Sequence, residues 1–262
     1  FLQSIGSLKA PEPLAKDPST RFALLEFISG NPPQEIGESD ILDATEFLAE
    51  MNAQRAFAKN LPSVSEACFS IQAHLETTAA RIERLQQIQS TSEDHEKAVF
   101  FIRDTLLPLW HELRKRIEAL PDSARHEILA PSERCLSPSD FGFHNALRQS
   151  DGTLRYVDFE YAGWDDPAKT LIDFTNQPDR LLPESLAALF LEKTIPLFRN
   201  PNALHRRLAL LTPLYQLKWA CICLNAFFPH RPLDPTHPLP LQLSRANVMA
   251  SRAINEIAKT PH

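Results

Sequence analysis

Glycine is scarce in this chain of 262 residues, which has only 6 glycines against 22 prolines. Loops that cradle phosphate groups with backbone N–H groups need several glycines close together, so the sequence has little of that chemistry. Methionine is rarer still, at 2 residues, and the first residue is phenylalanine instead of methionine. We therefore expect that the chain is processed, cut or missing its natural beginning.

Long hydrophobic runs are absent as well. The apolar stretches extend over a few residues each, whereas a membrane-spanning helix needs about 20. The chain has 4 cysteines and no secretory signal peptide, which predicts reduced thiols in a cytoplasmic protein. With 43 % hydrophobic and 23 % charged residues, the composition is that of a globular protein. We expect a cytoplasmic protein with no membrane partner.

Charge is distributed unevenly along the chain, whose net charge is −6. Residues 1–176 carry 17 basic and 28 acidic side chains, whereas residues 177–262 carry 10 basic and 5 acidic ones. Because an acidic protein is a poor match for nucleic acid, we expect no nucleic-acid partner. The basic C-terminal third predicts a separate role for that part of the chain.

Helical patterns dominate the sequence. Apolar residues recur at helical spacing through residues 38–119 and again after about residue 167. In the first region, Ser63-Val64-Ser65-Glu66 has the pattern of a capping box and predicts a helix start, as does Thr91-Ser92-Glu93-Asp94. Pro108 predicts a kink in the helix that begins at residues 91–94 and is expected to run to about Leu120. The later helices are expected at residues 167–177, 183–198, 203–228 and 240–258.

Strand signals are confined to two places. Residues 21–28 predict a strand between turn signals at 17–20 and 29–30. Near the centre of the chain, residues 150–152 (Ser-Asp-Gly) are typical of a hairpin turn and precede a short strand at 154–159. The sequence thus predicts a mostly helical body with a small hairpin rich in polar residues.

Side chains suited to phosphoryl transfer gather on this hairpin. Asp140 and Asn145 stand in an Asp-x-x-x-x-Asn spacing, and Asp158 follows a strand that would return the chain to the same place. Carboxylate and amide oxygens are ligands for Mg²⁺, which bridges phosphate groups. Phosphoryl transfer also needs a carboxylate that orients the attacking hydroxyl and accepts its proton. The alternative is that both aspartates, and Asn145 with them, are turn residues.

These residues resemble a known family. The segments Asp140-Phe141-Gly142-Phe143-His144-Asn145 and Val157-Asp158-Phe159-Glu160-Tyr161-Ala162-Gly163 resemble the aminoglycoside phosphotransferase and choline kinase family, whose fold is protein-kinase-like. The resemblance extends over about residues 10–230 and rests mostly on residues 137–174. By this resemblance Asp140 would be the catalytic base, while Asn145 and Asp158 would bind Mg²⁺.

The resemblance also implies a nucleotide site. Residues 22–30 resemble the family's hinge, the strand that joins two lobes and offers backbone groups to adenine. Glu26, Phe27 and Ile28 would then border the adenine of ATP, mainly through their backbone. Asp173 resembles the family's buried aspartate and would hold the catalytic loop by hydrogen bonds.

The sequence departs from the family in two respects. Pro138 stands where the family has a histidine, two residues before the catalytic aspartate. The family's phosphate loop, strand lysine and helix glutamate all precede the hinge, and the short segment before the hinge here contains no such set. We expect that the natural protein has an N-terminal lobe that this chain lacks. The alternative is a natural truncation and therefore a non-catalytic relative.

Several polar residues near the motifs have two possible roles. His144 either contacts phosphate or substrate, or is a packed or solvated loop residue. Asp165 and Asp166 either bind a cationic or hydroxylated substrate or cap the helix that starts at Pro167. We expect Lys169 to be exposed rather than catalytic.

The acceptor substrate is weakly constrained by the sequence. The basic region at 177–262 favours a neutral or anionic alcohol over a polycationic aminoglycoside. Arg206-Arg207 could meet an anionic acceptor, although a solvated helix face is the simpler role. Tyr215, Trp219 and Phe227 form a helical aromatic stripe, which is more typical of a core than of a cage for a quaternary amine.

We therefore predict an α+β, mostly helical fold that corresponds to a protein-kinase-like C-terminal lobe with a remnant of the N-terminal lobe. Residues 1–30 would be that remnant with the hinge, and residues 31–262 the helical lobe, with the catalytic hairpin at about 135–165. The predicted function is ATP- and Mg²⁺-dependent phosphoryl transfer to a hydroxyl of a small molecule, such as a sugar or an amino alcohol. The alternative is a non-catalytic nucleotide- or partner-binding pseudokinase. The oligomeric state is left open.

Overall fold

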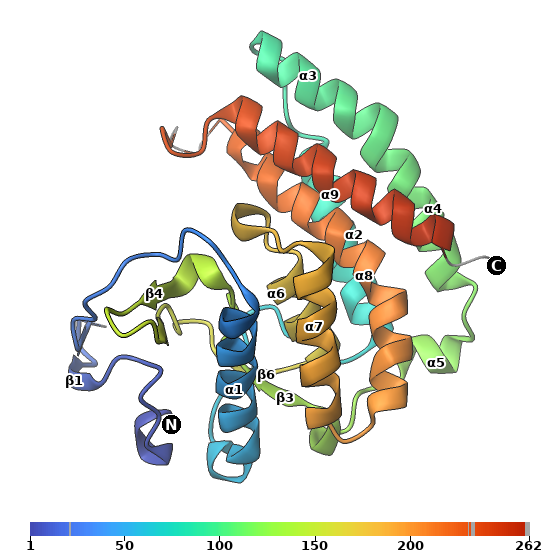
Figure 1. Cartoon of the computed structure of the whole chain (residues 1–262). Helices are drawn as coiled ribbons and strands as arrows, with labels where there is room; N and C mark the ends of the chain where they lie inside the picture. Colours follow the sequence, from blue (N-terminus) through green and yellow to red (C-terminus); the bar gives the residue numbers. More distant parts are fainter. Residues whose placement is uncertain (21, 230, 232–233, 260–262) are drawn as a thin grey trace. The chain divides into compact units, whose positions relative to one another are not determined.

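The structure, a computed structural model, describes residues 1–20, 22–229, 231 and 234–259 (Figure 1). The chain divides into two compact units, the first made of residues 1–67 and 130–204 and the second of residues 68–129 and 205–262. Helices predominate, and the described strands form two-stranded sheets only. The predicted α+β, mostly helical fold is thereby confirmed.

The strands of the first unit form three antiparallel pairs. Strand β1 (Pro13–Asp17) pairs with β2 (Phe22–Leu25), β3 (Cys135–Ser137) with β6 (Gly163–Asp165), and β4 (Ala146–Arg148) with β5 (Leu154–Tyr156). The β4–β5 hairpin turns through Gly152 at a φ of 89°, as the Ser-Asp-Gly signal predicts. Strand β2 ends at Leu25 instead of residue 28, and Arg21 lies outside the described residues.

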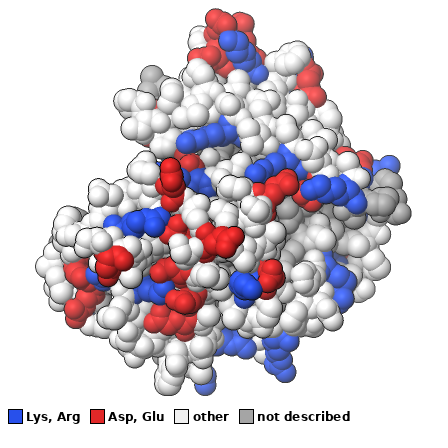
Figure 2. Space-filling view, in the orientation of Figure 1, with Lys and Arg blue, Asp and Glu red and all other residues white. Residues whose placement is uncertain are grey.

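Helix α1 (Glu38–Ala53) is fixed at its start by its own side chain. Asp40 accepts a hydrogen bond from the N–H of Gly37 at 2.8 Å and pairs with Arg148 of β4 at 2.9 Å. The helix buries Ile41, Ala44, Phe47, Leu48 and Met51 and packs against α7 (Glu184–Thr194). Figure 2 shows acidic side chains gathered over α1 and the neighbouring N-terminal segment.

The second unit is helical in its described residues. It contains α2 (Ile71–Leu85), α3 (Glu93–Phe101), α4 (Leu107–Glu118), α5 (Asp122–His126), α9 (Leu239–Lys259) and most of α8 (Pro201–Cys223). The predicted helix start at Ser92 is confirmed, because its side chain caps α3 by accepting from the N–H of His95.

The helix start predicted at Ser63 is wrong. Helix α2 begins at Ile71, where the Ser70 hydroxyl accepts from the N–H of Ala73 at 3.1 Å. Ser63 instead forms a β-bridge with Trp164 of β6, and the N–H of Val64 donates to the Trp164 carbonyl at 3.0 Å. Pairing with a strand far along the chain overrides the local capping pattern.

A π-helical turn interrupts the helix just before Pro108, where the sequence predicts a kink. Residues Ile102–Leu106 form this turn between α3 and α4, and Pro108 occupies the first turn of α4. A proline cannot donate a backbone hydrogen bond and crowds the carbonyl four residues earlier. The wider π turn accommodates both effects.

Two of the three residues of the predicted aromatic stripe, Tyr215 of α8 and Phe227 of the 3₁₀ turn that follows it (Leu224–Phe227), belong to the core, in line with the simpler of the two predictions. Tyr215 is 1 % exposed, and its hydroxyl lies 2.6 Å from Nδ1 of the buried His74. Phe227 is also buried. A cage for a quaternary amine is therefore not formed by these side chains.

The four cysteines are buried and form no disulfide bond in the described chain. Burial raises the pKa of the Cys221 thiol to about 12, so this thiol stays protonated at neutral pH. Among the described residues, no helix is both long enough and apolar enough to cross a membrane.

Candidate active site

The three predicted residues Asp140, Asn145 and Asp158 lie close to the ends of strands β3, β4 and β5 in the first unit. Asp140 follows β3, and Asn145 directly precedes β4. The β4–β5 ladder continues past its last strand residue, because the N–H of Val157 donates to the Asn145 carbonyl at 2.9 Å. Asp158 is the next residue. The ladder therefore brings the segments of the two sequence motifs together.

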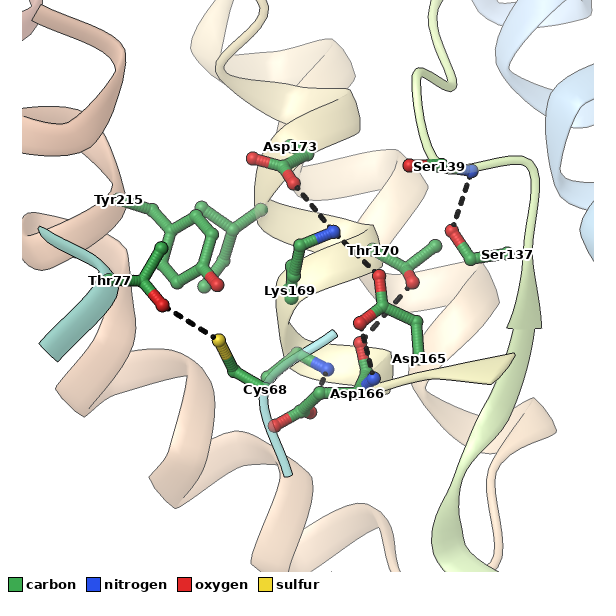
Figure 3. Close-up of polar contacts among 12 residues, drawn as sticks. Cys68, Thr77, Ser137, Ser139, Asp165, Asp166, Lys169, Thr170, Asp173 and Tyr215 are labelled. Atoms are coloured by element: carbon green, nitrogen blue, oxygen red, sulfur yellow. Dashed lines mark hydrogen bonds and ion pairs between the residues drawn. The ribbon is translucent and has the colours of Figure 1, made fainter. Parts of the chain in front are cut away.

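Two residues of this site have unusual backbone conformations. Ser139 has a φ of 73° and Asp158 a φ of 65°, and in the described chain they are the only non-glycine residues with positive φ. Ser139 is held by the hydroxyl of Ser137, which accepts from its N–H at 3.0 Å (Figure 3). Such conformations cost of order 1–3 kcal/mol each and cluster at functional sites. Each one directly sets the direction of an aspartate, Asp140 in one case and Asp158 in the other.

The carboxylate of Asp140 is held by two side chains of its own loop. Nε2 of His144 donates to Oδ1 at 3.1 Å, and Nδ2 of Asn145 lies 3.3 Å from Oδ2 and 3.0 Å from the Asp140 carbonyl oxygen. The hydrogen bond from His144 is the largest cause that lowers the pKa of Asp140, partial burial opposes it, and the charge of Lys169 lowers it further. Asp140 is therefore ionised at neutral pH and fixed in direction.

Gly142 makes room for the imidazole of His144. A Cβ on Gly142 would lie 2.7 Å from Nδ1 of His144, closer than real contacts allow. The ring is largely buried, with 18 % of the side chain exposed. The glycine in the Asp-Phe-Gly-Phe-His-Asn segment therefore permits the contact between His144 and Asp140.

Asp158 is exposed and carries no hydrogen bond to another described residue. Its pKa is raised, first by partial desolvation and then by the negative charges of Glu160 and Asp140. A bound cation would offset the repulsion between Asp158 and these negative charges. The amide of Asn145 points its Nδ2 at Asp140, which leaves Oδ1 as an acceptor.

This donor set fits Mg²⁺. Mg²⁺ takes oxygen ligands and usually combines one or two protein carboxylates with phosphate oxygens and water. Asp158 and Asn145 provide such oxygens beside a second carboxylate, that of Asp140. No cluster of three or more His, Cys, Asp or Glu side chains suited to a metal occurs in the described residues. A metal here would therefore depend on the ligands that a bound nucleotide supplies.

The aromatic residues that follow the two motif aspartates pack against the same residue of the core. Phe141 and Phe159, each directly after its aspartate, contact the same ring, Phe47 of α1, at centroid distances of 6.0 and 5.9 Å. Phe47 also stacks on Tyr156 of β5 at 4.7 Å. Because Phe47 is fully buried, one core residue fixes the position of both aspartates.

A buried ion triad lies behind β3. Lys169 of α6 (Pro167–Thr175) is 3 % exposed, and its Nζ lies 2.6 Å from Asp165 and 3.4 Å from Asp173 (Figure 3). Burial acts to lower the pKa of Lys169, but the two carboxylates raise it well above its ordinary value. Burial raises the pKa of Asp165 to about 6 against the opposing charge of Lys169. Lys169 and Asp165 are therefore charged at neutral pH, and the expectation that Lys169 is exposed is wrong.

The capping alternative holds for Asp166, whose carboxylate accepts from the N–H of Ala168 at 2.8 Å at the start of α6. Asp165 is fully buried and bound to Lys169, so it does not face a substrate.

The spacing of the triad residues in the sequence is a signal that the analysis of composition and motifs did not use. Lys169 and Asp173 are four residues apart on one face of α6, and Asp165 lies four residues before Lys169, at the end of β6.

The predicted hinge segment, residues 22–30, ends beside β4. Asn31 and Arg148 exchange two backbone hydrogen bonds, of 3.1 and 2.8 Å. Gly30 has a φ of 159°, and a Cβ there would lie 2.7 Å from the Arg148 carbonyl oxygen. Only a glycine allows this close approach, which joins the hinge to the strand that begins directly after Asn145.

The three predicted adenine-binding residues differ in what they contact. Glu26 binds Arg155 through both carboxylate oxygens at 2.7 Å, and its N–H donates to Glu12 at 2.8 Å, so both groups are occupied. The backbone of Phe27 and Ile28 makes no hydrogen bond to other described residues. A cavity of ≈ 670 Å³ beside Glu26 is lined by the N-terminal segment, α1 and the β4–β5 hairpin, and neither Phe27 nor Ile28 lines it.

No protein-family description matches this sequence, and no curated protein matches it. Solved structures with a similar fold are found. A choline kinase from Cryptosporidium parvum Iowa II is 13 % identical with a TM-score of 0.59, over 98 % of this chain and 75 % of that chain. A choline/ethanolamine kinase family protein from Mesorhizobium loti is 17 % identical with a TM-score of 0.59, over 99 % of this chain and 76 % of that chain.

A third similar structure is a thermostable mutant of an aminoglycoside phosphotransferase, in a ternary complex with AMP-PNP and hygromycin B. It is 15 % identical with a TM-score of 0.56, over 99 % of this chain and 81 % of that chain. These matches confirm the predicted resemblance at the level of the fold. The chain has the protein-kinase-like fold of choline kinases and aminoglycoside phosphotransferases.

Proposed function

We propose that this chain is an ATP- and Mg²⁺-dependent phosphotransferase whose acceptor is a hydroxyl group of a small molecule. The observation that carries the proposal is the ionised carboxylate of Asp140, held by His144 and Asn145 next to Asp158. In phosphoryl transfer a fixed carboxylate orients the acceptor hydroxyl and accepts its proton. We assign this role to Asp140.

Asn145 and Asp158 would hold Mg²⁺ through their side-chain oxygens. The bound ion would neutralise charge that builds up on the phosphate oxygens during transfer. The protein's own contribution is positioning, because the left-handed backbone at Asp158 and the Phe47 anchor fix the ligand direction before substrate binds.

The nucleotide would contact the hinge through the backbone of Phe27 and Ile28. Their hydrogen-bonding groups bond to no other described residue, and the solved structure of the same fold with AMP-PNP supports nucleotide binding. Glu26 would border the adenine without donating to it, because its N–H and carboxylate are already bound to Glu12 and Arg155. Residues 1–30 would then act as the hinge and the part before it, and residues 31–262 as the catalytic lobe.

The acceptor is proposed to be a sugar, an amino alcohol or a similar small alcohol. The basic balance of residues 177–262 favours these over an aminoglycoside. The protein is proposed to act in the cytoplasm.

The experiment is an ADP-release assay with ATP, Mg²⁺ and a panel of sugars, amino alcohols and aminoglycosides. We expect one acceptor class to stimulate turnover and Asp140→Asn to lower kcat by about 10²–10⁴-fold. Asp151→Asn is the matched control, because Asp151 is an exposed aspartate of the neighbouring hairpin turn that bonds only to Thr153. Turnover that is equal in the Asp140 and Asp151 variants would refute the catalytic role.

The second candidate function is a nucleotide- or partner-binding pseudokinase. It is favoured by Pro138, which stands where the resembled family has a histidine two residues before its catalytic aspartate. It predicts that ATP with Mg²⁺ binds without turnover for any acceptor, and that Asp158→Asn weakens this binding. Equilibrium dialysis with labelled ATP separates it from the enzyme.

A further inference from the structure

A second cavity in the first unit has basic walls and no acidic ones. It has a volume of ≈ 520 Å³, and Arg55, Lys59, Arg134 and Trp164 are among its lining residues. No acidic side chain is among the described residues that line it. Its size lies in the range of pockets that bind small organic molecules, roughly 300–1,000 Å³. Nothing in the proposed phosphotransferase mechanism uses this cavity.

The walls of this basic cavity are fixed by hydrogen bonds. Arg55 starts a 3₁₀ turn (Arg55–Ala58), and its guanidinium donates to the carbonyls of Ser132 at 2.8 Å and Arg134 at 3.0 Å. These bonds join two segments that are far apart in the chain. The cavity is therefore formed before any ligand binds.

Trp164 forms a rigid aromatic wall. Its indole Nε1 donates to the Ala58 carbonyl at 3.1 Å, and its backbone pairs with Pro62 and Val64 at 2.9 and 3.0 Å. With the polar edge of the ring bound to protein, the remaining surface that the ring offers is apolar. A flat apolar group can stack there.

Two basic residues of the cavity, Arg55 and Lys59, carry positive charges that no ion pair neutralises in the described part of the chain. Arg55 bonds to carbonyl oxygens only, and in the described part of the chain neither Arg55 nor the exposed Lys59 forms an ion pair. Two uncompensated cations in one concave wall attract an anion. The planar guanidinium of Arg55 matches a carboxylate or phosphate group.

From this combination we infer that the basic cavity binds a small organic anion whose phosphate or carboxylate group is attached to a flat ring. The anionic group lies against Arg55 and Lys59, and the ring lies against Trp164. Arg134 precedes β3 and Asp140 follows it, so the two residues lie beyond opposite ends of this strand.

The test uses protein labelled with 5-fluorotryptophan, followed by ¹⁹F NMR during titration with phenyl phosphate. The chain has 3 tryptophans, and Trp164→Phe identifies the Trp164 resonance by its loss. We expect phenyl phosphate to shift the Trp164 resonance in a saturable way, inorganic phosphate to bind more weakly, and phenol to leave it unchanged. A titration with benzoate in place of phenyl phosphate shows whether the cavity binds a carboxylate or a phosphate more tightly.

Charge reversal at the rim provides the decisive variant. Lys59→Glu should raise the Kd for phenyl phosphate by about tenfold or more, and Lys115→Glu, which reverses an exposed charge in the second unit, should leave it unchanged. Asp140→Asn should also leave it unchanged, which separates this site from the phosphotransferase site. An unmoved Trp164 resonance, equal binding of phenol, or an unaltered Kd in Lys59→Glu would each overturn the proposal.

Discussion

Nε2 of His144 lies 3.1 Å from Oδ1 of Asp140, four residues earlier in the chain. This hydrogen bond is the largest cause of the lowered pKa of Asp140. Pro138 stands where the resembled family has a histidine before its catalytic aspartate. In this chain an imidazole contacts the proposed base from a later position in the same loop.

We predict that His144→Ala lowers kcat by about ten- to a hundredfold with little change in KM, because a charge-assisted hydrogen bond of about 1.5–3 kcal/mol that holds Asp140 is lost. His144→Gln should restore part of the rate, since its amide can donate to the carboxylate. The measurement is steady-state turnover with the acceptor found in the panel.

His126→Ala is the matched control for this prediction. His126 also lies four residues from an aspartate, with its Nδ1 3.3 Å from Asp122, but this pair is exposed in the second unit. We expect no change in kcat. A comparable loss in both variants, or a change in KM alone after His144→Ala, would contradict the positioning role.

Phe47 is predicted to be the main packing residue of the site. Phe47→Ala should lower the free energy of unfolding by about 3–5 kcal/mol, because it leaves a cavity beneath Phe141 and Phe159. Phe57→Ala removes a ring that is 76 % exposed and should cost no more than about 0.5 kcal/mol. Urea denaturation of the three proteins measures the difference, and equal midpoints would refute the packing role.

The sequence correctly predicted those structural features that depend on interactions between residues close together in the chain. Ser92 caps α3 through its own side chain, and the Ser-Asp-Gly turn closes the β4–β5 hairpin between adjacent strands. The motif residues Asp140 and Asp158 meet because that hairpin returns the chain, which spacing alone suggested. The kinase-like fold followed from the same two motifs.

Long-range pairing explains what the sequence could not predict. Ser63 pairs with β6, about a hundred residues later, so its capping pattern is not used. The sequence around Lys169 favours an exposed side chain. It does not show that Asp165, the partner of Lys169, is buried by pairing of β6 with β3. The contact between His144 and Asp140 depends on the space at Gly142, which only the folded loop reveals.

Removing the ammonium of the ion triad is predicted to destabilise the protein strongly. Lys169→Met leaves the buried carboxylates of Asp165 and Asp173 without their cation, and we expect a loss of about 3–5 kcal/mol. Lys193→Met breaks an exposed pair with Glu192 and should cost at most about 1 kcal/mol. Thermal and urea unfolding check both values, and a Lys169→Met protein as stable as the control variant would contradict a charged triad.

Gly30 is predicted to be required for the contact between hinge and β4. In Gly30→Ala the new Cβ would collide with the Arg148 carbonyl, so the hinge must move away and ATP should bind more weakly, by about tenfold. Gly37→Ala is the control, because a Cβ there approaches only Asp40 at 4.0 Å. Equilibrium dialysis measures the affinity, and unchanged binding in Gly30→Ala would argue against a nucleotide at the hinge.

The pair of Glu26 and Arg155 predicts a specific dependence of stability on pH. Hydrogen bonds from Arg155 are the largest cause that lowers the pKa of Glu26 from 4.5 to about 2. A carboxyl whose pKa is lower in the folded protein stabilises it fully above the unfolded value, and this contribution is lost as pH falls from about 4.5 through about 2. Glu26→Gln should therefore be less stable than the wild type by a constant amount above pH 5, and the two proteins should converge only as the pH falls below about 2. Urea unfolding at a series of pH values tests this, and a stability difference that persists at the lowest pH would show that packing, not the ion pair, joins the hinge to β5.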